Sequence, residues 1–419
     1  MSASPLPQPS SSASYGERLA FVVELAEQLH AYGTTAQRLE GAVDAVSTRL
    51  GLECEPWSNP TGLILTFSDP ERPRGETDTT RVIRLPPGET DLAKLCAADR
   101  IAEDVMAGRL DLRAGREALR ALARPRGRRG DALTVFGFGL AAAAVAGLLR
   151  LPWLDIATAG TSGLLIGLLV VASEGRPQLK EAGDALAALL ASLLAILVAS
   201  FVAPLNLNTV IIAALIVLLP GMGLTNAVNE LTSQHLVSGT ARFAGALTTV
   251  MKLAVGSMIA VKLAELVGLA PQVRAWRPQP DWVEWLALAL AAYSFALLFH
   301  SARRDYPLVM AAAVAGYLVS RFAGGAWGSP AGVFLSALLL TAAGNAYARW
   351  VKRPGSLVRV PGIIMLVPGS ASLRGVMNLV QQQDVAAGQD AALTVLNILL
   401  ALIAGLLFGN LLLPTRRNL

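Results

Sequence analysis

The sequence is poor in charged residues, in cysteine and in histidine. Charged side chains make up 16% of its 419 residues, whereas average soluble domains have roughly 25%. Its two cysteines and three histidines are not spaced as metal ligands are. We therefore expect reduced thiols, no metal centre and no cofactor. A fold that depends on disulfide bonds is not expected either.

Apolar residues take the place of the missing charge. They make up 53% of the chain, and the mean hydropathy is +0.51. The sequence has the composition of a soluble protein up to about Arg129 and is dominated by long apolar stretches beyond it. The net charge of +5 is explained by basic residues that flank membrane spans. We therefore expect a lipid bilayer, and no nucleic acid, among the partners.

The part of the chain before the apolar stretches has two predicted segments. Residues 1–14 lack the basic and apolar regions of a signal peptide and are predicted to form a disordered tail. Residues 15–130 are predicted to form a small cytoplasmic α+β domain. Its expected elements are helices within 15–50 and 91–123 and strands at 62–67 and 81–85. The three- and four-residue spacing in the first helical region predicts one apolar helix face, made of Ala36, Leu39, Val43, Val46 and Leu50.

The first helical region of this domain carries two local signals. Gly33 and Thr34 are expected to interrupt it, and Thr34 or Thr35 is expected to cap the helix that follows. The polar residues Thr34, Glu40, Asp44 and Cys54 form no nucleophile–base or metal motif, and solvated helix faces explain them better. We therefore do not expect an enzyme. The sequence does not distinguish a gate from an oligomer contact as the role of this domain.

The apolar part divides into ten predicted transmembrane helices, each near the ~20 residues that a bilayer requires. If the N-terminus is cytoplasmic, the outside loops contain only four basic residues, Arg150, Arg274, Arg277 and Arg321. The other basic residues that flank the predicted spans lie in the inside segments. This bias predicts a bacterial cytoplasmic (inner) membrane protein with both termini in the cytoplasm. The predicted spans are 132–149, 153–173, 185–203, 207–226, 243–267, 282–300, 306–322, 330–350, 357–378 and 391–412.

Two of these spans contain a Pro-Gly pair, Pro220-Gly221 and Pro368-Gly369. Proline removes a helical hydrogen bond, and such a break within a bilayer persists only where protein or a wet cavity surrounds it. The two prolines are 148 positions apart (368 − 220). The same shift carries the start of the first span to the start of the sixth. We therefore predict two inverted five-helix repeats, at 131–268 and 281–413.

Inverted repeats with broken helices are typical of secondary transporters, whose substrates bind near the membrane midplane at the breaks. The free amides and the dipole of each half-helix favour an anion there. Two alternatives are a pair of structural kinks and a channel. The matched spacing of the breaks argues against kinks, and the lack of a repeated polar stripe argues against a channel.

Three segments resemble the threonine/serine exporters (the ThrE type). "AYGTTAQRLEGAVDAVSTRLGL" resembles their soluble-domain signature, a Gly-Ala-hydroxyl-x-x-Arg-x-Glu pattern. "LLPGMGLTNAVNELTSQHLVSGTARFAGAL", with Ser238, Gly239 and Arg242, resembles their first Pro-Gly segment, and "LVPGSASLRGVMNL" the second. Two departures are Gly33-Thr34 in place of Gly-Ala, and Glu230 where the family leads us to expect Asp.

The resemblance implies export of small hydroxy amino acids, driven by the proton gradient. It also implies that both halves, which some relatives divide between two polypeptides, are fused here. A two-polypeptide type is associated with succinate export, so a dicarboxylate exporter is the alternative. The implied partners are threonine or serine, protons and the bilayer, and a homo-oligomer stays open.

Polar residues near the breaks are the candidate binding residues. Amides at 222–224 or 370–372 are expected to take the carboxylate, with Arg374 as a reinforcing or snorkelling cation. Glu230 is a candidate for the ammonium or the coupling proton, or else a solvated residue at the cytoplasmic mouth. Lys252, a charge within a predicted span, is expected to face a cavity or a carboxylate. The predicted substrate-binding residues are Pro220, Gly221, Asn226, Asn229, Glu230, Lys252, Pro368, Gly369, Ser370, Ser372, Arg374 and Asn378.

Overall fold

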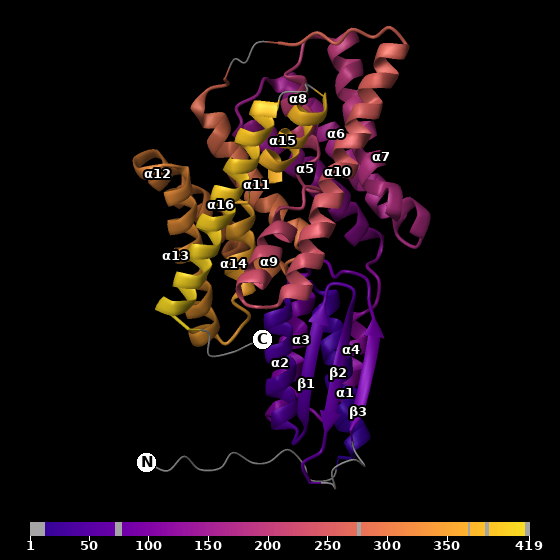
Figure 1. Ribbon diagram of the computed structural model, residues 1–419, viewed down its shortest axis with the longest axis vertical. Coiled ribbons are helices and arrows are strands. Elements are labelled where there is room, and N and C mark those ends of the chain that lie inside the picture. The colour runs from indigo at the N-terminus through magenta and orange to yellow at the C-terminus, as the bar shows by residue number, and fades with distance from the viewer. Residues whose placement is uncertain (1–12, 72–77, 275–277, 368, 382–384, 415–419) are drawn as a thin grey trace.

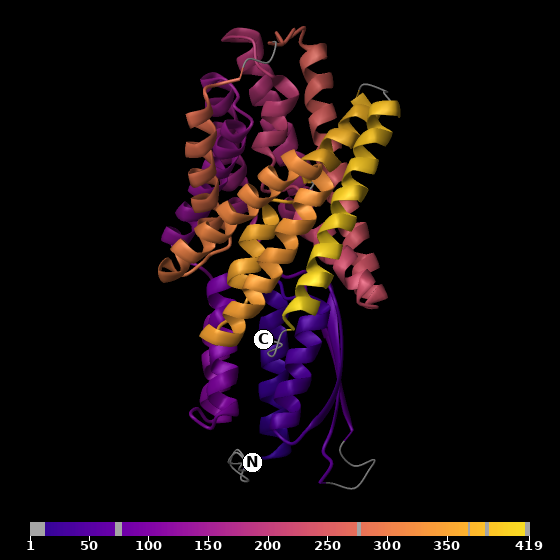
Figure 2. The same ribbon diagram turned by 90° about the vertical axis from the view of Figure 1, so that its left-hand side faces the viewer.

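The protein consists of a small N-terminal domain and a long helical bundle, with the domain at one end of the bundle (Figure 1). A computed structural model describes residues 13–71, 78–274, 278–367, 369–381 and 385–414. A view turned by 90° shows the domain below the bundle again, so the two parts are arranged end to end (Figure 2).

The N-terminal domain is an α+β unit, as predicted. Its three strands form an antiparallel sheet in the order β1-β2-β3, and its helices are packed along the sheet (Figure 1). The elements are α1 (Tyr15–Ala31), α2 (Ala36–Arg49), β1 (Glu53–Asn59), β2 (Gly62–Ser68), β3 (Thr79–Arg84), α3 (Leu92–Met106) and α4 (Leu112–Leu122).

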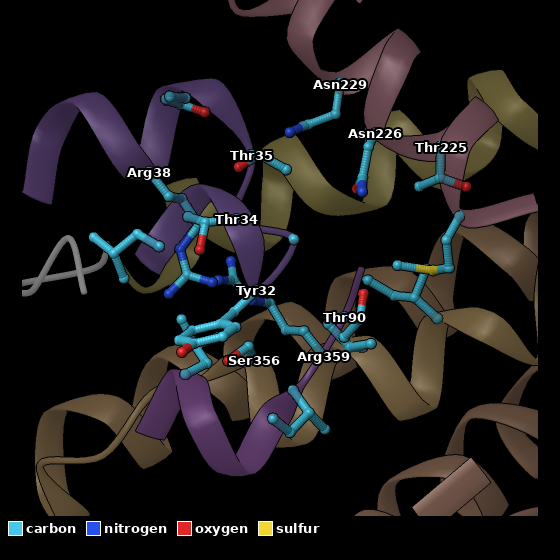
Figure 3. A pocket seen from close by; sticks show the side chains of 18 of the residues that line it. Tyr32, Thr34, Thr35, Arg38, Thr90, Thr225, Asn226, Asn229, Ser356 and Arg359 are labelled. Atoms are coloured by element: carbon cyan, nitrogen blue, oxygen red, sulfur yellow. The ribbon is translucent and has the colours of Figure 1, made fainter. Parts of the chain in front are cut away.

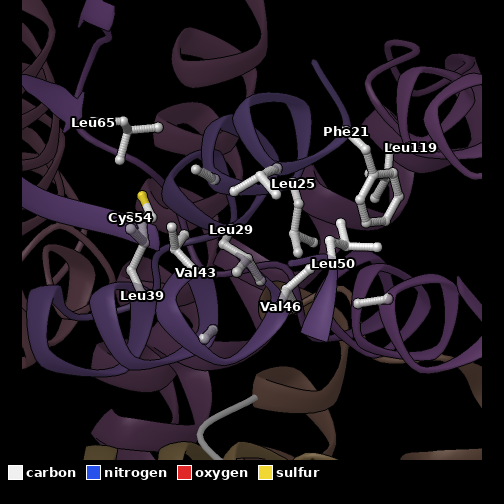
Figure 4. Packing of buried hydrophobic residues seen from close by; sticks show 14 of the residues in the cluster. Phe21, Leu25, Leu29, Leu39, Val43, Val46, Leu50, Cys54, Leu65 and Leu119 are labelled. Atoms are coloured by element: carbon white, nitrogen blue, oxygen red, sulfur yellow. The ribbon is translucent and has the colours of Figure 1, made fainter. Parts of the chain in front are cut away.

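The predicted apolar face of α2 is confirmed. Leu39, Val43 and Val46 are all buried and pack with Phe21 and Leu25 of α1 in one core (Figure 4). Gly33 interrupts the helical region with a left-handed φ of +77°, which glycine adopts at little cost. The interruption between α1 and α2 is therefore confirmed as well.

Two features of the domain differ from the prediction. Strand β1 was not predicted, because its buried positions are Cys54 and Ser58 rather than aliphatic residues. It contains Pro56, which an edge strand tolerates. The single helical region expected at 91–123 is two helices, because Asp111 caps a new helix by accepting a hydrogen bond from the amide of Ala114 at 2.6 Å.

The bundle is that of a multi-pass membrane protein. Within the described residues, nine segments are long and apolar enough to cross a bilayer. The fourth predicted span, 207–226, is divided into two helices that are each too short to cross. The elements are α5 (Arg128–Leu148), α6 (Trp153–Ser173), α7 (Pro177–Phe201), α8 (Leu207–Ala214), α9 (Gly221–Thr232), α10 (Leu236–Leu266), α11 (Asp281–Leu298), α12 (Tyr306–Trp327), α13 (Ser329–Val351), α14 (Ser356–Ile364), α15 (Gly369–Gln381) and α16 (Val385–Leu412).

Both predicted breaks are present. The first separates α8 from α9, and the second separates α14 from α15. The two breaks also lie against each other. A Cβ atom added to Gly221 would collide with Val367 and would lie 3.8 Å from the Cα of Gly369. Two segments almost 150 residues apart therefore meet where each helix is interrupted. Pro368 lies outside the described residues.

The domain is attached to both halves of the bundle. The backbone amide of Leu92, at the start of α3, donates a hydrogen bond to the carbonyl of Phe299 after α11, at 2.9 Å. Leu92 and Cys96 form a buried cluster with Val309 and Leu357 of the second half. Contacts with α9 and α10 of the first half are described below.

Candidate functional site

A cavity of about 170 Å³ lies between the N-terminal domain and the half-helices α9 and α14 (Figure 3). This is far more than the ~10–15 Å³ that one water molecule requires. Met222 and Ile363, which lie beside the two breaks, are among its lining residues. The polar lining residues are Tyr32, Thr34, Thr35, Gln37, Arg38 and Thr90 of the domain, Thr225, Asn226 and Asn229 of α9, Ser356 and Arg359 of α14, and Asn410 of α16.

Two arginines, Arg38 of α2 and Arg359 of α14, are directed toward each other in this cavity (Figure 3). Burial lowers the pKa of Arg38 from its ordinary value, and the nearby carboxylate of Asp99 partly offsets that effect. A Cβ on Gly344 of α13 would lie 2.8 Å from Cγ of Arg359, so the stem of Arg359 passes closely over that glycine. None of the described lining residues is Asp or Glu.

Three hydroxyl groups that line the cavity have no hydrogen-bond partner among the described residues. They belong to Thr34, Thr225 and Ser356. Thr225 is 2% exposed and Ser356 is 3% exposed. Buried polar atoms in folded proteins are almost always paired, so this cavity contains unused hydrogen-bonding capacity from both parts of the protein.

Glu230 of α9 lies next to this cavity and is completely buried. Its carboxylate accepts hydrogen bonds from Nε of Arg242 at 3.0 Å and from Oγ of Ser238 at 2.7 Å. It also accepts one from the backbone amide of Ala36 in the N-terminal domain, at 3.0 Å. The alternative of a solvated Glu230 is therefore wrong.

The contact with Ala36 also corrects the predicted cap of α2. Thr35 is the N-cap residue, but its side chain forms no capping hydrogen bond. The carboxylate of Glu230 supplies the acceptor instead, at the helix end where the dipole favours a negative charge. Helix α2 is thus capped by a residue of the membrane part.

A second polar contact joins the same elements. Nε2 of His235, at the start of α10, lies 3.0 Å from Oε2 of Glu40 on α2. The other oxygen of Glu40 accepts a hydrogen bond from the amide of Ser58 at 2.7 Å. The carboxylate of Glu40 is therefore held between the sheet of the domain and the bundle.

The other predicted site residues are divided between two places. Asn226 and Asn229 line the cavity. Gly369, Ser370, Ser372 and Arg374 belong to α15, on the other side of the second break, and Arg374 is exposed. The position of Asn378 is within α15, but its side chain, like the whole of Pro368, lies outside the described part of the chain.

Lys252 lies on α10 and is not among the lining residues of the cavity. Its Nζ donates a hydrogen bond to the carbonyl oxygen of Glu181 at 3.0 Å and is 3.9 Å from the carboxylate of Asp184. The expected neighbouring carboxylate is present at the start of α7. The geometry offers no support for a role in the same cavity.

The sequence prediction did not include Arg38 or Arg359. Arg38 is the arginine of the Gly-x-hydroxyl-x-x-Arg-x-Glu pattern, so its signal was present in the quoted motif. Arg359 lies within a predicted span, where an ionisable residue is a functional candidate by default. The same rule led us to Lys252 and would also have identified Arg359.

Two family models match the chain. Residues 20–264 match the family described as "Putative threonine/serine exporter", and residues 284–412 match "Threonine/Serine exporter, ThrE". The first match alone covers more than half of the sequence. The chain belongs to the threonine/serine exporter family. No curated protein and no solved structure matches this family member.

The segment by which this family member resembles the other threonine/serine exporters has a clear structural role. Ser238 and Arg242 bind the carboxylate of Glu230. A Cβ on Gly239 would lie 2.8 Å from the carbonyl oxygen of Ala227, so glycine lets α10 approach α9 closely enough for both bonds. The Ser-Gly-x-x-Arg pattern therefore builds the pocket that holds Glu230.

Proposed function

We propose that the protein exports small hydroxy amino acids such as threonine and serine from the cytoplasm, as a proton-coupled antiporter in the bacterial inner membrane. In this proposal both termini are cytoplasmic, and transport rather than catalysis is the activity. The observation that carries the proposal is the cavity beside the two helix breaks, in a member of the threonine/serine exporter family.

The lining of the cavity suits an amino acid with a hydroxyl group. A guanidinium group binds a carboxylate with two parallel hydrogen bonds. Arg38 and Arg359 each provide a guanidinium group. The unpaired hydroxyl groups of Thr34, Thr225 and Ser356 are available to the substrate. The side-chain carbonyl groups of Asn226 and Asn229 are the acceptors that we assign to the ammonium group.

Alternating access would use the two half-helix pairs. The pair α9 and α14 lines the cavity that the N-terminal domain covers. We propose that Ser370, Ser372 and Arg374 of α15, beyond the second break, contact the substrate when the site opens to the other side. The two inverted repeats, 131–268 and 281–413, would exchange these roles.

Glu230 is the proposed proton carrier. Its carboxylate holds Arg242 and the amide of Ala36 together. Protonation would remove the charge that binds Arg242 and weaken the contact with the domain. Proton uptake would therefore loosen the domain over the cavity, and this links the proton to the access of substrate.

A dicarboxylate such as succinate is the second candidate substrate. Two arginines line the cavity and no described lining residue is acidic. An amino acid brings one negative and one positive charge into this site, whereas a dicarboxylate brings two negative charges. The two arginines favour the dicarboxylate, although Asp99 partly compensates the charge of Arg38, and the family favours the amino acid.

Transport by the purified protein in liposomes tests the proposal. Uptake of labelled threonine, serine and succinate is measured under an imposed pH gradient, with protein-free liposomes as the control. Threonine or serine flux that collapses with a protonophore supports the first candidate. Succinate flux alone supports the second, and the absence of flux for all three contradicts both.

A further inference from the structure

We propose that Arg38 and Arg359 form a single carboxylate-binding site shared by the N-terminal domain and the bundle, so that the domain supplies part of the ligand's binding site. The ligand class is a small organic acid or amino acid with at least one carboxylate. The inference rests on the proposed function only for the choice of probes, because the site is argued from its own geometry.

The first argument is the placement of the two charges. Arg38 and Arg359 come from separate parts of the protein, 321 positions apart (359 − 38), yet both side chains point into one cavity (Figure 3). Like charges repel more strongly away from bulk water. Burial already lowers the pKa of Arg38. A bound anion between the two groups would turn this repulsion into two attractive interactions.

The second argument is that the positive charges of the two arginines are neutralised to different extents. Asp99, a buried carboxylate of α3, acts on Arg38. In the described part of the chain no ion pair or hydrogen bond neutralises Arg359. A partly buried charge without a partner is costly, so the position of Arg359 is best explained by a ligand that provides the negative charge.

The third argument is the unpaired hydroxyl groups. Thr225 and Ser356 are almost fully buried, line the same cavity and have no hydrogen-bond partner among the described residues. Together with Thr34 they add donors from both parts of the protein to the cavity that the two arginines line. A carboxylate has two oxygens that accept several hydrogen bonds, which matches this set of donors.

Sharing the site between two parts has a thermodynamic consequence. If the ligand contacts Arg38 only when the domain is in place, ligand binding stabilises docking, and docking raises ligand affinity by the same factor. The domain then forms one side of the binding site, and the bound ligand keeps the domain docked on the bundle. This gives the domain a direct role in recognising the carboxylate.

Equilibrium binding of labelled threonine and labelled succinate to the full-length protein in lipid nanodiscs tests the inference. We expect Arg38→Gln and Arg359→Gln each to weaken the binding of whichever probe the wild type binds by at least about tenfold, since a charged hydrogen bond is lost. Arg113→Gln, on the exposed face of α4, and Arg303→Gln, exposed before α12, are the matched controls and should stay within about twofold.

Variants that retain the charge serve as a control for loss of folding. Arg38→Lys and Arg359→Lys keep a cation but lose the planar pair of donors, and we expect affinities between those of the wild type and the Gln variants. If a Gln variant does not fold, its Lys variant decides. Hydrogen exchange supplies a second readout: a bound probe should protect the first turn of α2 in the wild type and not in Arg359→Gln.

The outcomes separate this inference from the proposed function. Binding that depends on both arginines without transport supports the site and contradicts the exporter proposal. Transport that is unchanged in both Gln variants supports the exporter and overturns the site. The site is also overturned if the wild type binds neither probe, or if only Arg359 matters, since the domain would then contribute nothing to recognition.

Discussion

The carboxylate of Glu230 accepts a hydrogen bond from the backbone amide of Ala36, at 3.0 Å and across 194 positions of sequence. A residue of a broken membrane helix thus caps the first turn of a helix in the N-terminal domain. The same carboxylate binds Arg242, so one buried group joins α2, α9 and α10. The charge of this side chain therefore contributes directly to holding the domain over the cavity.

Replacement of Glu230 by glutamine tests this dependence. The side chain keeps its length but loses its charge, so Arg242 loses its negatively charged partner. Breaking a buried pair costs up to about 3–5 kcal/mol, and part of Arg242 is exposed, so we expect about 2–3 kcal/mol. Hydrogen exchange should be faster in the first turn of α2, and proton-coupled flux should be lost. Glu265→Gln, which removes an exposed pair with Lys262, should change neither. Unaltered exchange in Glu230→Gln would show that the carboxylate does not hold the domain.

The two cysteines report on docking of the domain. Burial raises the pKa of both thiols to about 11, so at pH 7.5 their thiolate fraction is on the order of 10²-fold below that of an exposed thiol. Cys54 lies in the core of the domain, and Cys96 lies between the domain and the bundle.

We expect both thiols to react slowly with iodoacetamide in the wild type. In Glu230→Gln, Cys96 should become much more reactive while Cys54 stays slow, because only the interface opens. A rise in both rates would indicate unfolding of the domain instead. The folded state raises both pKa values above their unfolded values. Ionisation of the thiols should therefore lower the free energy of unfolding as the pH rises from about 8.5 through about 11.

The contact between the two breaks can be tested with a pair of glycines in α9. Gly221 lies against Val367 and Gly369, so the Cβ of Gly221→Ala has no room. The nearest atoms to a Cβ on Gly223 are 3.8 Å away. Alanine in a helix otherwise stabilises by about 0.5–1 kcal/mol relative to glycine. We expect Gly221→Ala to abolish transport and Gly223→Ala to preserve it. Equal activity of the two variants would mean that the breaks do not need to touch.

Gly239 and Gly245 provide a similar pair in α10. A Cβ on Gly239 would meet the carbonyl oxygen of Ala227 at 2.8 Å, whereas a Cβ on Gly245 has no atom within 4 Å. We expect Gly239→Ala to separate α10 from α9, to weaken the bonds of Glu230 and to lower the melting temperature by several degrees. Gly245→Ala should melt at or above the wild-type temperature. A normal melting temperature for Gly239→Ala would contradict the close packing described here.

Local signals in the sequence were sufficient for much of the fold. Apolar runs predicted the membrane segments, the spacing of Leu39, Val43 and Val46 predicted a buried helix face, and the Pro-Gly pairs predicted the breaks. Strand β1 was not predicted because Cys54 and Ser58, rather than aliphatic residues, occupy its buried positions. The ten transmembrane helices and the inverted repeat stay predictions. Nine segments of the described residues are long and apolar enough to cross a bilayer, and the fourth predicted span is divided into α8 and α9.

The site was harder to predict because the domain and the bundle both contribute residues to it. Asn226 and Asn229 follow directly from their position after the first break, and both line the cavity. The pairing of Arg38 with Arg359, and of Glu230 with Ala36, joins segments that are far apart in the chain. No local pattern encodes such a contact. The sequence therefore indicated Glu230 as important but not the helix that it caps.

The attachment of the N-terminal domain to both halves of the bundle has a consequence for the integrity of the chain. The domain binds α9 and α10 through Glu230 and His235, and it binds the end of α11 through Leu92 and Phe299. A protein cleaved in the connection between α10 and α11 would still have its two fragments joined by this domain. The domain is thus a non-covalent link between the two halves, in addition to the direct packing of α5 against α11 and of α10 against α15.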